Sequence, residues 1–301
     1  MFSGKKVYHI LPYNSPASFL GADDIFEENR KHISISGVQK KFSVLLEKNK
    51  LRLAREGERG QYILKPVPDG CARSDQMPAN EHLTMQLARQ VFGIETAENA
   101  LIFFKDGEPA YITRRFDVSE DGAKIAQEDF ASLAGMTPQT HGEHYKYQGN
   151  YSEIFQLMRR YVPAYKTEAP KLLKVLLFNY LFSNGDAHYK NFSLLETPMG
   201  DYRLSPAYDL LNSRIHITDK DFALEDGLLP KNLAQGKIHR QFALLTEQAG
   251  IPQKIFNDML ELMVSKSRVV EKMIAASFLD ESTKKNYWQQ YQARLKRILK
   301  R

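Results

Sequence analysis

The hydrophobic pattern of this chain changes once along its length, near residues 113–117. Before that point, apolar residues alternate with polar ones in short runs, which is typical of β-strands. After it, they recur every three or four residues in longer segments, as in amphipathic helices. This order predicts an α+β fold of two lobes, with a β-rich N-lobe over residues 1–116 and a helical C-lobe over 117–301.

The local patterns place the individual elements of both lobes. In the N-lobe we expect hairpins at 41–47 with 51–54 and at 100–104 with 109–113, a strand at 61–65, and a helix at 80–92. Asn80 would cap this helix and Gly93 would end it. In the C-lobe we expect strands at 192–195 and 202–204, and helices at 128–135, 152–161, 171–183, 242–249, 254–277 and the C-terminal end.

The net positive charge of the chain comes from its C-terminal end. Lysine and arginine total 42 against 36 acidic residues, and residues 284–301 hold seven of the basic residues and no acid. Trp288, Tyr291, Leu295 and Ile298 recur there at helical spacing, which predicts a helix with one face docked on the body of the protein. The opposite, basic face is either a solvated helix surface or a contact for nucleic acid or an acidic protein.

Composition excludes several classes of protein. No stretch approaches the ~18 consecutive apolar residues that a membrane span needs, and the first 20 residues lack the apolar region of a signal peptide. The single cysteine, Cys71, cannot form an intramolecular disulfide or a thiolate metal cluster. We therefore expect a cytoplasmic protein with no membrane partner.

The polar segment 184–191, NGDAHYKN, carries the strongest chemical signal. It lies between an apolar helix and an apolar strand, where polar side chains are costly to bury without partners. Taken alone, it could be a polar Asn-Gly turn. Asp186 and Asn191, however, have the spacing D-x-x-x-x-N of the catalytic loop of protein kinases. In that loop the Asp accepts the proton of the substrate hydroxyl and the Asn binds a magnesium ion.

A second acid, Asp209, follows the next predicted strand. A turn at 199–201 would bring Asn191 and Asp209 to the same end of a hairpin, and their oxygen atoms are ligands that Mg²⁺ prefers. By itself, Asp209 could be an ordinary turn or cap residue.

Three features of the N-lobe suit phosphate binding. Loop 32–40 combines serines with Gly37 and could place backbone N–H groups and hydroxyls against phosphate oxygens. Lys65 ends a strand and Glu81 begins a helix, which is how kinases orient a lysine toward the α- and β-phosphates. Lys65 and Glu81 each have an ordinary alternative. Lys65 could be a lysine at the edge of the sheet, and Glu81 could be a favourable negative charge in the first turn of its helix.

Together these segments resemble the HipA family of bacterial toxin serine/threonine kinases. The resemblance is carried, in family order, by SISGVQKK (34–41), YILKP (62–66), NEHLTMQLA (80–88), RRFD (114–117), QEDF (127–130), NGDAHYKNFSL (184–194) and LSPAYDLL (204–211). It implies a bilobal protein-kinase-like fold and a serine/threonine protein kinase of a toxin–antitoxin system that uses ATP and Mg²⁺.

The resemblance also implies roles at the matching positions. Asp186 would be the catalytic acid that accepts the hydroxyl proton, and Asn191 and Asp209 would be the metal ligands. The residues implied to bind the nucleotide are Ser36, Gly37, Val38, Gln39, Lys65, Glu81, Thr113, Arg114, Arg115, Phe116, His188, Lys190 and Tyr208. Of these, 113–116 would be the interlobe segment facing adenine, where Arg114 stands in place of the usual acid of an ERFD motif.

Within the family, the chain looks like the short form, HipT, which lacks the N-terminal subdomain. This implies autophosphorylation at Ser34 or Ser36, where a phosphate of about −1.5 to −2 charge would repel the nucleotide. The implied partners are an aminoacyl-tRNA synthetase as protein substrate, a HipB-like antitoxin, and a separate HipS-like small protein. DNA would be reached only through the antitoxin or the basic tail.

Two other functions stay open. A catalytically silent member of the family would act as a regulatory, DNA-associated partner in an antitoxin complex. A metal phosphohydrolase would use Asp186, His188 and Asp209, although the separation of these residues matches no recognised hydrolase signature.

Overall fold

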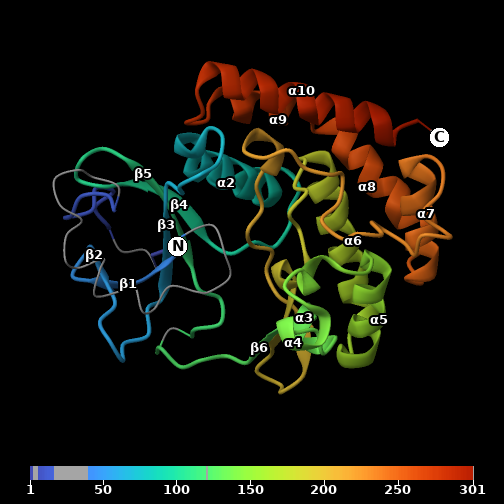
Figure 1. Cartoon of the computed structure of the whole chain (residues 1–301), viewed down its shortest axis with the longest axis horizontal. Helices are drawn as coiled ribbons and strands as arrows, with labels where there is room; N and C mark the ends of the chain where they lie inside the picture. Colours follow the sequence, from blue (N-terminus) through green and yellow to red (C-terminus); the bar gives the residue numbers. More distant parts are fainter. Residues whose placement is uncertain (3–5, 17–39, 120, 301) are drawn as a thin grey trace.

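The structure is a computed structural model that describes residues 1–2, 6–16, 40–119 and 121–300. A β-sheet forms one end of the molecule and most of the helices form the other, so the predicted α+β fold is confirmed (Figure 1). The C-terminal helix runs along the top of the molecule and reaches over both parts (Figure 1).

The larger sheet lies at the N-terminal end, and its five strands have the spatial order β2-β1-β3-β5-β4 with every neighbouring pair antiparallel. The strands are β1 (Phe42–Glu47), β2 (Lys50–Leu53), β3 (Tyr62–Pro66), β4 (Asn99–Phe103) and β5 (Pro109–Arg114). Both predicted hairpins are confirmed. Side chains alternate across β3, so Leu64 packs in the core of the sheet while Lys65 points to the other face.

Helix α2 (Met77–Gln86) follows β3 and continues into a π-helical turn (Leu87–Val91). It begins three residues before the predicted start, because Pro78 fits the first turn, where its missing N–H breaks no helical bond. Asn80 is therefore not the cap: its side chain is buried and donates to the carbonyl of Asn212 at 2.9 Å. Gly93 ends the helix in the left-handed region, at φ +60°, as predicted.

The C-terminal half consists of helices around a three-stranded sheet of order β6-β7-β8. The strands are β6 (Gln127–Asp129), β7 (Ser193–Glu196) and β8 (Tyr202–Leu204). The helices are α3 (Phe130–Leu133), α4 (Pro138–His141), α5 (Tyr151–Tyr161), α6 (Tyr165–Leu181), α7 (Ile238–Gln248), α8 (Gln253–Ser265), α9 (Ser267–Ala275) and α10 (Glu281–Ile298).

Helices α6 and α7 begin six and four residues before their predicted starts at 171 and 242, and two further predicted helices differ in kind from the structure. The segment 128–135 is only partly helical, because its first residues pair with β7 and Asp129 then caps the short α3 by accepting from Ser132 N–H at 2.9 Å. The segment 254–277 is two helices that meet at Lys266. The apolar spacing continues through this break, with Met263 and Val270 both buried, so periodicity alone did not reveal it.

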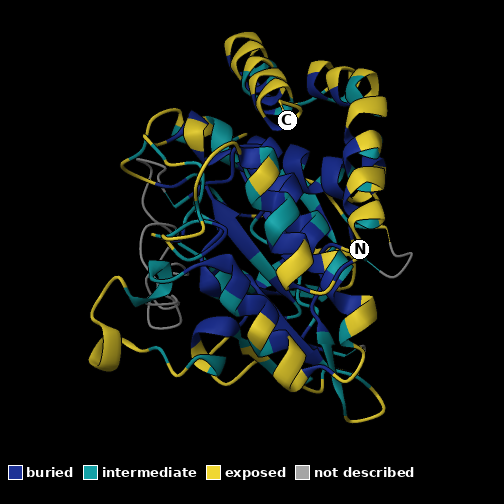
Figure 2. Cartoon of the chain, turned by 90° about the vertical axis from the view of Figure 1, so that its right-hand side faces the viewer, coloured by how far each residue is buried: buried dark blue, intermediate teal, exposed yellow. Residues whose placement is uncertain are grey.

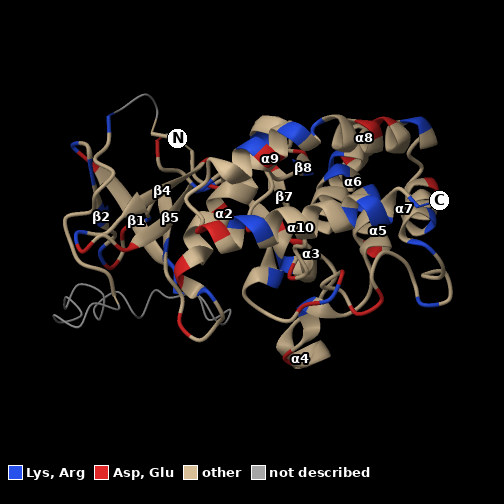
Figure 3. Cartoon of the chain, turned by 90° about the horizontal axis from the view of Figure 1, so that it is seen from above, with Lys and Arg blue, Asp and Glu red and all other residues tan. Residues whose placement is uncertain are grey.

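Helix α10 docks by the predicted face. Tyr291 and Ile298 are buried, and Trp288 and Leu295 are half-buried. Arg294, however, is not part of the outer basic face: it is 4% exposed and forms a 2.6 Å ion pair with Asp221. Figure 2 shows the buried interior and the exposed outer turns of the helices, and Figure 3 marks in blue the lysines and arginines along α9 and α10.

No helix among residues 1–2, 6–16, 40–119 and 121–300 is both long and apolar enough to span a bilayer.

Candidate active site

A cleft of about 470 Å³ opens between the sheet and the helical half. Residues from both halves line it, so segments far apart in sequence meet across it. The predicted site residues among them are Lys65, Glu81, Asp186, His188, Lys190, Asn191, Tyr208 and Asp209.

An ion-pair network joins the two halves at the back of this cleft. The ammonium of Lys65 lies 2.6 Å from Oε1 of Glu81 on α2 and 2.5 Å from Oδ1 of Asp209. The side chains of Lys65 and Glu81 are 5% and 2% exposed, whereas that of Asp209 is 26% exposed. The Lys65–Glu81 pair is therefore internal, and Asp209 opens to the cleft.

Opposing effects set the pKa values of this network. Burial alone would raise the pKa of Asp209, but the charges of Lys41 and Lys65 outweigh it and hold that pKa well below its usual range. Burial would lower the pKa of Lys65, but Asp209 and Glu81 outweigh it and raise that pKa. Lys65 is thus a cation and Asp209 an anion at neutral pH.

The β7–β8 hairpin brings Asn191 and Asp209 together, as the sequence suggested. The amide of Asn191 donates to Oδ2 of Asp209 at 3.3 Å and accepts from the N–H of His188 at 3.1 Å. Lys41 lies 3.7 Å from the same Asp209 oxygen. Asp209 has φ +54°, a left-handed conformation that an Asp tolerates better than most residues and that is common at functional sites.

Asp186 also lines the cleft. Its Oδ1 accepts a 2.8 Å hydrogen bond from the hydroxyl of Tyr147. Burial raises the pKa of Asp186, and the Tyr147 bond opposes this rise. The ring of His188 lies edge-on to that of Tyr147, 5.1 Å away, and burial together with Lys146 lowers the pKa of His188 to about 3. His188 is therefore neutral.

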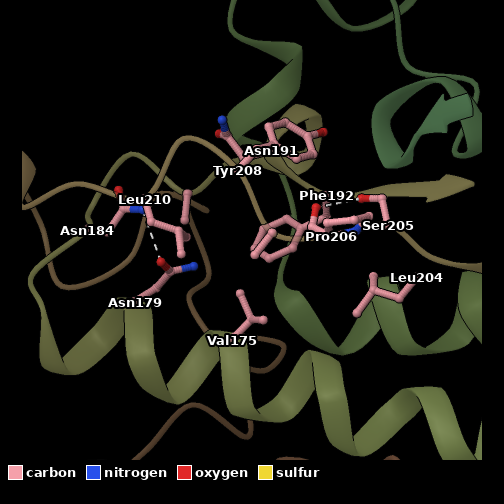
Figure 4. A pocket seen from close by; sticks show the side chains of 12 residues that line it. Val175, Asn179, Asn184, Asn191, Phe192, Leu204, Ser205, Pro206, Tyr208 and Leu210 are labelled. Atoms are coloured by element: carbon pink, nitrogen blue, oxygen red, sulfur yellow. Dashed lines mark hydrogen bonds between the residues drawn. The ribbon is translucent and has the colours of Figure 1, made fainter. Parts of the chain in front are cut away.

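A small cavity of about 10 Å³ lies below the cleft floor, behind Asn191 and Tyr208 (Figure 4). One amide nearby, that of Asn184, donates to Oδ1 of Asn179 on α6 at 3.0 Å, which ties the start of segment 184–191 to the helix before it (Figure 4). The void has the volume of about one water molecule, so the floor is close-packed. Asn191 and Tyr208, which line both the small cavity and the cleft, are therefore supported by close packing beneath them.

A second set of bonds holds the backbone next to Asp186. The N–H of Gly185 donates to Oγ of Ser213 at 2.9 Å, and that hydroxyl donates to the carbonyl of Ser183 at 3.1 Å. Ser213 also bonds Asp219. Ser213 therefore holds the chain beside Asp186 from behind.

The interlobe residues 113–116 do not line the cleft. Thr113 and Arg114 lie in β5, where the Thr113 hydroxyl donates to the carbonyl of Glu98. Arg115 binds Asp117 through two bonds of 3.0 and 2.6 Å. Only Phe116 approaches the site, through its ring contact with Tyr208 at 5.4 Å. Ser34, Ser36, Gly37, Val38 and Gln39 lie outside the described residues.

The cleft also holds residues to which the sequence assigns no role, among them Lys41, Lys146 and Tyr147. Lys41 is the last residue of SISGVQKK, so its motif was recognised but no role was given to it. Lys146 and Tyr147 come from a short 3-10 turn before α5 and belong to no recognised motif. Only the fold brings that turn to Asp186, and no local pattern could have indicated it.

Asn191 and Asp209 are the residues that could hold a magnesium ion. Within the described ranges, no three His, Cys, Asp or Glu side chains gather into a site that would bind a metal by itself. One ionised carboxylate beside an amide fits a Mg²⁺ ion that keeps water and takes its other ligands from phosphate oxygens.

Comparisons with known proteins show which proteins this chain is similar to. "Putative kinase Y4mE" of Sinorhizobium fredii (strain NBRC 101917 / NGR234) is 33% identical over 187 residues, which cover 60% of this chain and 42% of that protein. "Putative kinase Y4dM" of the same strain is 30% identical over 256 residues, which cover 80% and 60%. The chain thus spans about half the length of these relatives.

Two solved structures share the fold. One is HipA of Shewanella oneidensis MR-1, in a complex with HipB and its operator DNA, with a TM-score of 0.67 and 22% identity over 89% of this chain and 65% of that one. The other is the Helicobacter pylori proinflammatory kinase CtkA, with a TM-score of 0.55 and 14% identity over 88% and 92%. The fold is therefore the bilobal, kinase-like one that the sequence predicted. A family model described as "HipA-like C-terminal domain" matches residues 33–272, and this chain belongs to that family.

Proposed function

We propose that this protein is a magnesium- and ATP-dependent serine/threonine protein kinase of the HipA type. The observation that supports it best is the convergence of Asp186, Asn191 and Asp209 with the Lys65–Glu81 pair around one cleft. A buried lysine–glutamate pair beside two oxygen ligands and a carboxylate base is the set that phosphoryl transfer requires.

In this proposal each residue has one task. Asp186 accepts the proton of the substrate hydroxyl as the new oxygen–phosphorus bond forms and the bond to ADP breaks. Lys65, held by Glu81, contacts the phosphates of ATP. Asn191 and Asp209 would hold Mg²⁺, which neutralises phosphate charge when bound. Ser36, Gly37, Val38 and Gln39 would cover the phosphates, and of residues 113–116 only Phe116, whose ring contacts Tyr208, would lie near the nucleotide.

Phosphate incorporation from γ-labelled ATP with Mg²⁺ tests the proposal. Asp186→Asn and Asp209→Asn should each reduce incorporation by about 10²-fold or more, because one removes the base and the other a metal ligand. Asp258→Asn, an exposed aspartate of α8, is the matched control and should retain activity. Undiminished labelling in both site variants would disprove the assignment.

We further propose autophosphorylation of Ser34 or Ser36, in keeping with the short HipT-like form. The mass of the intact expressed protein tests this, since one or two phosphates should appear in the wild type and be absent from Asp186→Asn. Ser34→Ala and Ser36→Ala then identify the residue. Masses of the wild type and Asp186→Asn that differ only by the substitution itself would exclude self-modification.

The proposed partners follow from the family. The solved relative HipA is in a complex with HipB and operator DNA, and we propose a HipB-like antitoxin for this chain, with DNA contacted mainly through it. The proposed protein substrate is an aminoacyl-tRNA synthetase, and a HipS-like small protein would complete the assembly. A cytoplasmic location belongs to the same proposal. Labelling of candidate synthetases by the wild type beside Asp186→Asn tests the substrate.

A further inference from the structure

Four lysines of the described chain line the cleft, and three of them have an anionic partner. Lys65 pairs with Glu81 and Asp209, at 2.6 and 2.5 Å. Lys41 lies 3.7 Å from Asp209, and Lys190 lies 4.0 Å from Asp129. The fourth, Lys146, forms no ion pair with any residue that the structure describes.

The position of Lys146 is set by the next residue, Tyr147. Lys146 and Tyr147 both belong to the 3-10 turn Tyr145–Tyr147, and the Tyr147 hydroxyl donates to Asp186 at 2.8 Å. The ammonium of Lys146 lies 5.0 Å from the centroid of the Tyr147 ring, a cation–π contact. Lys146 is thus anchored beside the carboxylate proposed to be the base.

The surroundings of Lys146 favour an anionic ligand. It is half-buried, and burial lowers its pKa while Asp186 opposes this. A cation taken partly out of water without a partner is unfavourable, so an anion that enters the cleft would gain by pairing with it. Segment 184–191 does not direct its lysine there, because Lys190 is turned toward Asp129 and the Tyr145 hydroxyl.

We propose that Lys146 is a catalytic residue that binds the phosphoryl group during its transfer from ATP to the substrate hydroxyl. The inference rests on the proposed kinase function and adds a residue from outside every recognised motif. The transferring group carries negative charge past Asp186, which is itself an anion when it acts as base. Lys146 offsets this repulsion most when the group lies between ATP and the acceptor, so it stabilises the transition state more than bound ATP.

Steady-state kinetics of Lys146→Met test the proposal. We expect kcat to fall by about 10²-fold, the usual cost of one transition-state donor, while KM for ATP changes less than about threefold. Lys146→Arg keeps the charge and should recover most of the rate. Lys105→Met, in the exposed turn between β4 and β5, is the matched control and should match the wild type. An unchanged kcat, or a raised KM with kcat unchanged, would overturn the proposal.

A binding measurement separates this inference from the kinase proposal itself. With Mg²⁺ and ADP, aluminium fluoride mimics the phosphoryl group in transfer. Wild-type protein should bind ADP more tightly when aluminium fluoride is added, and Lys146→Met should lose that gain while its affinity for ADP alone stays the same. An equal gain in both proteins would refute the role of Lys146 even if phosphate is transferred. A further outcome is that the wild-type protein transfers no phosphate and yet binds ADP more tightly with aluminium fluoride, while Lys146→Met does not. In that case the kinase proposal fails, and Lys146 stands as an anion-binding residue.

Discussion

The hydroxyl of Tyr147 donates a 2.8 Å hydrogen bond to Oδ1 of Asp186, the carboxylate proposed to be the base. Burial raises the pKa of Asp186, and this bond works against the rise by stabilising the ionised form. The ionised form is the active one, so activity is lost as pH falls through this pKa. In Tyr147→Phe the pKa rises further, and the acidic limb of the kcat/KM profile should move to higher pH. On the acidic limb of the profile we expect a loss of about two- to tenfold, the value of one hydrogen bond.

A control separates this effect from a general loss of packing. Tyr161→Phe, at the exposed end of α5, removes a hydroxyl far from the cleft and should leave the profile unchanged. A uniform fall in rate at every pH in Tyr147→Phe would instead show that the hydroxyl acts only through structure.

Lys65 and Glu81 should depend on one another for stability. Lys65→Met leaves Glu81 buried without its partner, which costs about 3–5 kcal/mol of unfolding free energy for a pair of this kind. Lys65→Met combined with Glu81→Gln should recover most of that loss, because the buried charge is removed as well. Urea unfolding of the two single variants and the double variant measures the coupling.

The same variants should behave differently toward nucleotide. Lys65→Met with Glu81→Gln regains stability but lacks the ammonium that contacts phosphate, so its affinity for ATP should stay low. Affinity that returns together with stability would show that the pair has only a structural role.

The order of elements in the fold could be predicted because each depends on a local signal. The hairpin β4–β5 has strands on both sides of a polar turn, and Gly93 marks the end of α2. The predictions were wrong where a contact with a residue far away in the sequence determines the local structure. Asn80 reads as a helix cap in sequence, but its amide is needed by Asn212, 132 residues away.

The site residues also fall into those that a local motif predicts and those that only the fold brings together. Asp186, Asn191 and Asp209 lie in two recognised motifs, and the short hairpin β7–β8 brings two of them together. Lys146 and Tyr147 reach Asp186 only because the chain between α4 and α5 folds back over the cleft. Charge partners could not be assigned from sequence either: Arg294 is one of the basic residues of the C-terminal segment, and only the fold shows that it is buried against Asp221.

Removing α10 should unfold the protein. Tyr287 and Tyr291 are fully buried, and the Tyr287 hydroxyl lies 2.7 Å from the Thr84 hydroxyl of α2. Loss of a buried aromatic side chain costs about 3–5 kcal/mol, so losing two together with Ile298 would consume most of the 5–15 kcal/mol that stabilises a typical domain. A chain ended at Thr283 should therefore show no cooperative thermal transition. A cooperative transition near that of the full chain would contradict this.

The basic face of α10 is better tested by removing its charges than by truncation, because truncation should unfold the protein. Lys285, Lys296 and Lys300 are exposed. Changing all three to Gln should leave the melting temperature and phosphate incorporation unchanged. If the face contacts DNA, the salt dependence of binding should weaken by about one unit of slope for each lysine that contacts a phosphate. Unchanged DNA binding at all salt concentrations would identify the face as solvated surface.

Gly185 should be needed for the position of Asp186. A Cβ added at Gly185 would lie 2.6 Å from the backbone carbonyl of Lys220 and would also contact the carboxylate of Asp219. The carbonyl belongs to backbone and cannot turn away, so Gly185→Ala should shift the chain beside Asp186, at a cost of about 1–3 kcal/mol. Because a misplacement of about 1 Å can cost about 10²-fold in rate, kcat should fall much more than stability.

Gly200→Ala provides the comparison that decides this prediction. Gly200 lies in the β7–β8 turn at φ +79° with open space around its Cβ position, so alanine there adds about 1–2 kcal/mol of backbone strain without touching the site. The two variants should therefore be similarly destabilised in urea, and only Gly185→Ala should lose about 10²-fold in kcat. Equal rates in the two variants would show that the contact with Lys220 stabilises the fold without positioning Asp186.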